Sequence, residues 1–147
     1  MNKFLIITII YFSQIFNNVL GSELKPLSEI LKSDTSEQTV LYSLLRCSAL
    51  HHSSSNKVLN STETNKQKVY EDGKKNAGLF ALSAFTMNKQ RKLQMSSKQI
   101  ENNIINIYDA YIKKWKINYA NTGNEYGEMT LEDLKVCKSI LTSIITK

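Results

Sequence analysis

The chain has 147 residues and a formal net charge of +6, with one Pro, five Gly and two Cys. This length is enough for one domain, and the low Pro, Gly and Cys content excludes a collagen-like chain, a Pro/Gly-rich linker and a cysteine-dense miniprotein. Apolar residues make up 41% of the sequence, which is sufficient for one modest core even after the apolar first twenty positions are set apart.

The first 21 residues have the layout of a secretory signal peptide. Lys3 gives a positive start, a mostly apolar run follows over 4–16, and Gly21 and Ser22 supply small residues for cleavage. A membrane-spanning helix needs about 20 apolar residues, and polar side chains interrupt this run too early. We therefore predict a signal peptide over 1–21 and a single helical domain over 22–147 that is periplasmic or secreted. An uncleaved signal anchor is the alternative.

The next segment predicts a short helix followed by a longer one. Pro26 can open the short helix, and Asp34 with Glu37 has the form of a capping box for a helix over about 36–51. Residues 51–56 are polar and are expected to form a loop. Another long helix begins near 61 or 62 and reaches about 88.

The helix expected over 62–88 has two distinctive patterns. Small residues along one face would let another helix approach closely, at Gly73, Ala77, Ala81 and Ala84. From 77 to 87 the segment is apolar nearly all round, because Leu79, Leu82 and Phe85 lie off that face. A helix apolar on every side is usually buried. The pattern therefore predicts that this helix forms the middle of the bundle.

Two more helices complete the predicted fold. Ser96 and Gln99 form a capping box for a helix over about 97–120, which residues 121–124 end. Thr130 begins the last helix, whose apolar stripe includes Cys137. We predict an all-α fold: a small bundle of about four main helices.

Cys47 and Cys137 are the two cysteines of the chain. Each lies within the apolar stripe of its predicted helix, and exported proteins tend to hold their cysteines as disulfides. Only one pairing exists. We predict a long-range disulfide that joins two packed helices.

No arrangement of residues typical of an enzyme is found. His51 and His52 are adjacent, so on a helix they point about 100° apart and suit a solvated helix end better than a metal site. We expect no metal and no cofactor. A hydrolase that uses neighbouring carboxylates is kept as a distant alternative, and helix capping is the simpler role for these acids: Glu125, Glu128, Glu132 and Asp133.

Two sets of side chains are candidates for binding. Apolar and aromatic residues of two helices could line a groove for a ligand or partner, or could be core: Leu79, Leu82, Phe85, Tyr108, Tyr111, Trp115 and Tyr119. Basic residues could bind an anionic surface, or could be solvated faces of a lysine-biased protein: Lys74, Lys75, Lys89, Arg91, Lys92, Lys113, Lys114 and Lys116. No specific nucleic-acid motif is found.

The function that these patterns favour is a non-enzymatic, exported protein that binds a partner protein through a helical face. The face predicted for this role combines Leu79, Leu82 and Phe85 with Tyr111 and Trp115. The alternative is a basic protein that binds anionic lipid or polymer.

Overall fold

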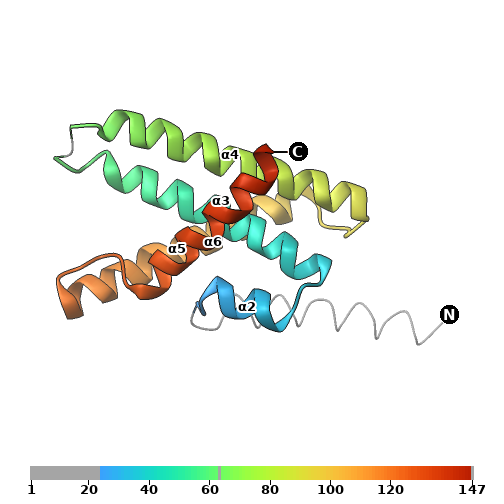
Figure 1. The fold of residues 1–147 in the computed structure, drawn as a ribbon, viewed down its shortest axis with the longest axis horizontal. Helices are drawn as coiled ribbons and strands as arrows, with labels where there is room; N and C mark the ends of the chain where they lie inside the picture. The colour runs from blue at the N-terminus through green and yellow to red at the C-terminus, as the bar shows by residue number, and fades with distance from the viewer. Residues whose placement is uncertain (1–23, 63, 147) are drawn as a thin grey trace.

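The computed structural model describes residues 24–62 and 64–146, and this part of the chain is all-helical with no strand. The helices pack as a small bundle (Figure 1), as the sequence predicted. Their bounds are α2 (Leu27–Ser33), α3 (Glu37–Val58), α4 (Lys66–Arg91), α5 (Ser97–Thr122) and α6 (Glu128–Ile145). The predicted signal peptide over 1–21 lies outside the described residues.

Helix α3 is the centre of the bundle. Every residue from 41 to 50 is buried, and α4 and α5 both pack more against α3 than against each other. The prediction that 77–87 forms the middle is therefore wrong, since Leu82 of α4 is 63% exposed. The pattern misled because α3 buries serines such as Ser43 and Ser48 among its leucines, which lowers its apparent hydrophobicity.

Helix α3 also continues through the residues expected to form a loop. Two serines in this stretch bond to carbonyls of the preceding turn: Ser53 Oγ donates to Leu50 O at 3.0 Å and Ser55 Oγ donates to His51 O at 2.6 Å. Their hydroxyls are thus satisfied inside a buried helix. The polar composition that favoured a loop instead serves a helix–helix contact.

The contact between α3 and α4 depends on small residues. Ser48 Oγ of α3 donates to the Ala77 carbonyl of α4 at 2.9 Å. At Gly73, an added Cβ would lie only 1.9 Å from Ser55 Oγ. This close contact confirms that the small residues of the second long helix admit a close neighbour.

The predicted signals at both ends of α5 agree with the structure. Ser96 and Gln99 form the predicted capping box of α5, and Gly123 ends that helix at a φ of 72°. At α3, however, the cap is Ser36 rather than Asp34, because the Asp34 carboxylate instead accepts the Ser36 N–H at 2.7 Å. Hydrogen bonds from Thr39 and Ser36 hold the pKa of Asp34 below its usual value.

The predicted disulfide is present. Cys47 and Cys137 join α3 to α6 with their Cα atoms 5.4 Å apart, and both residues are fully buried. A buried disulfide of this kind indicates an oxidising, exported compartment. None of the described helices has the length and apolar character needed to cross a membrane.

Two glycines of α4 should respond in opposite ways to alanine. Gly73→Ala must displace Ser55, and we expect a loss of about 1–2 kcal/mol in the free energy of unfolding. Gly78→Ala meets nothing within 4 Å of its Cβ, so it should stabilise the monomer by up to about 1 kcal/mol through helix propensity. Urea unfolding at low protein concentration measures both. A lower free energy of unfolding for Gly78→Ala would show that there is no space for a Cβ at this position.

Candidate functional site

The most conspicuous polar group in the interior is a buried ion pair between Arg46 of α3 and Asp133 of α6. Both side chains are 0% exposed, and Arg46 Nη2 contacts Asp133 Oδ2. Removing two opposite charges from water is costly unless each finds close, well-oriented partners. The surroundings of this pair should therefore supply further hydrogen bonds.

Asp133 accepts from three other helices. In addition to Arg46 of α3, the Tyr111 hydroxyl of α5 donates to Oδ2, and the Leu27 backbone N–H donates to Oδ1 at 2.7 Å. Leu27 is the first residue of α2, where a backbone N–H has no partner within its own helix. One carboxylate thus connects α2, α3, α5 and α6.

Arg46 has partners of its own. Its Nε donates to the Tyr111 hydroxyl at 2.9 Å, and Nη1 lies 3.4 Å from the Tyr42 hydroxyl. Desolvation lowers the pKa of Arg46, but Tyr111, Tyr42 and Asp133 together raise it, so the net shift is upward. Arg46 is therefore a permanent cation in the core.

Tyr111 remains protonated at neutral pH. Burial raises the pKa of its hydroxyl well above 10, and the negative Asp133 adds to that effect while Arg46 opposes it. The hydroxyl accepts from Arg46 and donates to Asp133, so its hydrogen-bonding capacity is used within the cluster. Because Arg46, Tyr111 and Asp133 are sealed from solvent, the cluster that they form is suited to holding helices together.

Arg46 was missed by the sequence analysis, although a signal was present. It is a lone charge between Leu45 and Cys47 in a strongly apolar stretch. Charged residues are almost never fully buried without a partner. An arginine in the middle of a buried helix thus implies a buried acid on a neighbouring helix.

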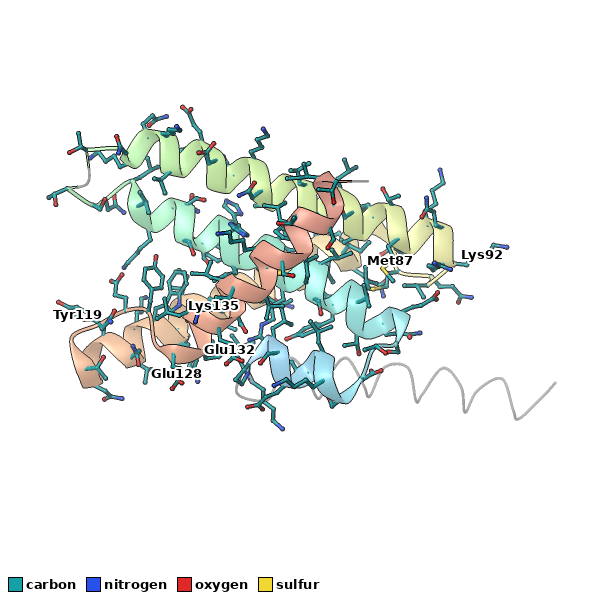
Figure 2. All side chains as sticks on the ribbon, viewed as in Figure 1. Met87, Lys92, Tyr119, Glu128, Glu132 and Lys135 are labelled. Atoms are coloured by element: carbon teal, nitrogen blue, oxygen red, sulfur yellow. A yellow bond between two sulfur atoms is a disulfide. The ribbon has the colours of Figure 1, made fainter. Side chains whose placement is uncertain are left out.

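The acids considered for hydrolysis serve different partners. Asp133 belongs to the buried pair, Glu132 accepts from Ser28 Oγ of α2, and Glu125 pairs with Lys57 at 2.7 Å. Glu128 is exposed in the first turn of α6 (Figure 2). Its negative charge there interacts favourably with the positive end of the helix dipole. Among the described residues, no group of three or more His, Cys, Asp and Glu side chains is placed to hold a metal ion.

The residues considered for a groove do not share one accessible surface. Tyr111 and Trp115 are in the core, and the Trp115 indole donates to Thr130 Oγ1 at 3.0 Å. Tyr108 is half-buried and accepts from Asn56, while Tyr119 is exposed near the end of α5 (Figure 2). The apolar residues of α4 are accessible without them: Leu82 is exposed, and Leu79 and Phe85 are half-buried.

The basic residues considered for anion binding are mostly exposed but are not gathered. Lys74 and Lys75 lie in the first half of α4, with Lys74 over the Tyr70 ring. Three others lie at the far end of that helix: Lys89, Arg91 and Lys92. Arg91 pairs with Glu37 at 3.3 Å. The remaining members belong to α5, where Lys113 and Lys116 are exposed and Lys114 is half-buried.

The histidines lie within α3 rather than at a solvated end, which corrects the prediction. His51 stacks on Phe80 of α4 with ring centroids 5.5 Å apart, and His52 lies edge-on to Tyr108 of α5 at the same distance. His51 Nε2 is buried with no hydrogen-bond partner in the described part of the chain. Burial lowers the pKa of His51 from 6.5.

One face of α4 is accessible along its whole length and is the best candidate for a binding site. We define the α4 outer face by six exposed residues that recur every three or four positions: Glu71, Lys75, Gly78, Leu82, Thr86 and Lys89. Such spacing places them on one side of a helix. The half-buried Leu79 and Phe85 border Leu82, so the centre of the face is apolar and its two ends are charged.

Removing the acid of the buried pair should be more damaging than removing the pair. Asp133→Asn leaves Arg46 charged and unneutralised, and we expect a loss of about 3–5 kcal/mol in the free energy of unfolding. The double change Arg46→Met with Asp133→Leu should lose much less. Urea unfolding followed by circular dichroism measures both, with Glu128→Gln as an exposed control. A double variant with a lower free energy of unfolding than Asp133→Asn would contradict this account of the pair.

His51 should make stability depend on pH on the acidic side. Because its folded-state pKa is below 6.5, its contribution is present above that pH and is lost as the pH falls through the folded-state pKa. The free energy of unfolding should thus decline as the pH falls below about 6.5. His51→Phe keeps an aromatic ring against Phe80 and should flatten that decline. If the free energy of unfolding of His51→Phe declined with pH as steeply as that of the unchanged protein, the decline would have to come from other groups.

Comparison with known proteins gives no relative from which a function could be transferred: no protein-family model, no curated protein and no solved structure matches the chain. The contacts and surfaces of the molecule are therefore the basis for its proposed function. Of these, the buried cluster is engaged in holding the helices, and the α4 outer face is open.

Proposed function

We propose that this chain is an exported helical protein, periplasmic or secreted, that acts by binding a partner protein through the α4 outer face. It works as a binding protein rather than as an enzyme. The observation that carries the proposal is the exposure of Leu82 in the middle of α4, between the half-buried Leu79 and Phe85.

Isolated exposed apolar side chains are normal on a soluble protein, and the arrangement is what singles out Leu82. Leu79 and Phe85 lie three residues before and after it, so the three side chains are neighbours on one helix surface. Gly78 has no side chain to shield them. The result is a continuous apolar strip with charged residues at both ends, the layout of an interface centre with a polar rim.

The distribution of charge supports a protein partner over an anionic lipid or polymer. An anionic surface is best bound by cations that converge on one face. Here Lys75 and Lys89 flank the apolar strip at a separation of about 21 Å along the helix, and Glu71 lies on the same face. A mixed-charge rim suits a partner that presents both signs.

Site-specific photocrosslinking in the native host tests this proposal. A photoreactive amino acid at position 82 should give a discrete crosslinked protein, whereas one at Ile105 of α5, which is 56% exposed, should not. Equal crosslinking from both positions, or none from position 82, would overturn the proposal.

The same face can be disabled without harm to the fold. Because Leu82 is exposed, Leu82→Glu should change the free energy of unfolding of the monomer by less than about 0.5 kcal/mol. Phe80→Ala, two residues earlier and fully buried, should lose about 3–5 kcal/mol. Thermal and urea unfolding compare the two. A large loss with Leu82→Glu would place Leu82 in the core and remove it from the interface.

A further inference from the structure

Gly78 is a residue that the monomer does not explain. It lies in the interior of α4, its φ is not positive, and an added Cβ would meet nothing within 4 Å. Glycine in such a position weakens a helix relative to alanine. Gly73, in contrast, is required by the contact with Ser55. The absence of a side chain at Gly78 would be useful to a molecule that approaches α4 from outside.

The residues around Gly78 show which molecule fits. Gly78 and Leu82 lie equally far before and after position 80 in the sequence. Glu71 and Lys89 also lie equally far before and after position 80. In an antiparallel pair of helices related by a two-fold axis at that height, each residue faces the one equally far on the other side of the midpoint. Leu82 then meets Gly78 of the second copy, and Glu71 meets Lys89 of the second copy.

We propose that the protein forms a two-fold symmetric dimer in which the α4 outer faces of two copies pack antiparallel. The dimer makes a second copy of the chain the partner protein of the α4 outer face, so it rests on the function proposed above. Each leucine occupies the space that the opposite glycine leaves, and two ion pairs form at the ends. Glu71 and Lys89 of the face are thus complementary to each other when the chain direction is reversed, and Lys75 faces Phe85 of the second copy.

The helical positions agree with this register. At 100° per residue, Glu71 and Lys89 project in the same direction, with Gly78 and Leu82 about 20° to either side. A helix pair that crosses at about 20° keeps side chains in contact over several turns. Glu71 and Lys89 are about 27 Å apart along α4, so such a shallow crossing brings both ion pairs within reach.

The dimer should be weak and reversible. A stable interface covers about 800 Å² on each partner, which is more than one face of a single helix offers. We expect a dissociation constant on the order of 100 μM. The protein would then be monomeric when dilute and dimeric where export or tethering concentrates it.

Sedimentation equilibrium of the exported, disulfide-bonded protein tests the dimer, from about 1 μM to about 1 mM. Glu71→Lys and Lys89→Glu should each weaken dimerisation about tenfold, since two attractive contacts become repulsive. The two changes in one chain should restore it. Ile105→Lys on α5 is the matched surface control and should have no effect.

A substitution at the glycine separates the interface from the fold. Gly78→Gln adds a side chain into open space, so the monomer should unfold at the same or higher temperature, yet dimerisation should weaken at least about tenfold because the pocket for Leu82 is filled. A dimer that withstands Gly78→Gln, or that the paired charge exchange does not restore, would overturn the register.

The outcomes also separate the dimer from the broader proposal. A protein that stays monomeric at about 1 mM but is crosslinked from position 82 to a different protein in its host would overturn the dimer and keep the α4 interface. No dimer and no crosslink from position 82 would overturn both. A crosslinked species of twice the chain mass supports both.

Discussion

The Asp133 carboxylate is the constraint around which this molecule is organised. It carries a charge in the interior, so it must be surrounded by donors or pay the full penalty of desolvation. Those donors come from Arg46, Tyr111 and the Leu27 backbone, on three other helices. Apolar packing tolerates small shifts of one helix against another, whereas a buried hydrogen-bonded pair tolerates few. The cluster therefore fixes how α2, α3, α5 and α6 are set against one another.

The disulfide and the ion pair reinforce the same contact. Cys47 directly follows Arg46 on α3, and Cys137 lies one turn after Asp133 on α6. The covalent link thus holds together the two helices that contain the opposite charges. In the chain-entropy view, a loop of this length contributes about 4–5 kcal/mol by restricting the unfolded chain.

Much of the fold could be predicted because local chemistry determines it. The capping box at Ser96, the stop at Gly123 and the pairing of Cys47 with Cys137 each follow from a few residues. The centre of the bundle could not be predicted in this way, because α3 is buried by its position between α4 and α5. Ser43, Ser53 and Ser55 donate to carbonyls within α3, and Ser48 donates to a carbonyl of α4. These serines can therefore be buried although they are not apolar. The role of Arg46 likewise depends on an acid 87 residues away.

The link between Leu27 and Asp133 also bears on how the chain can be processed. Leu27 lies only a few residues beyond the predicted cleavage position, yet its backbone N–H reaches an oxygen in the core. A peptidase that trimmed the N-terminal segment back to Pro26 would leave this contact intact. One that cut after Leu27 would remove a donor from a buried anion and would leave α2 without one of the hydrogen bonds that hold it to α6. Leu27, the first residue of α2, is thus tied to the interior of the protein, and its removal would weaken the hydrogen-bonded cluster that joins four helices.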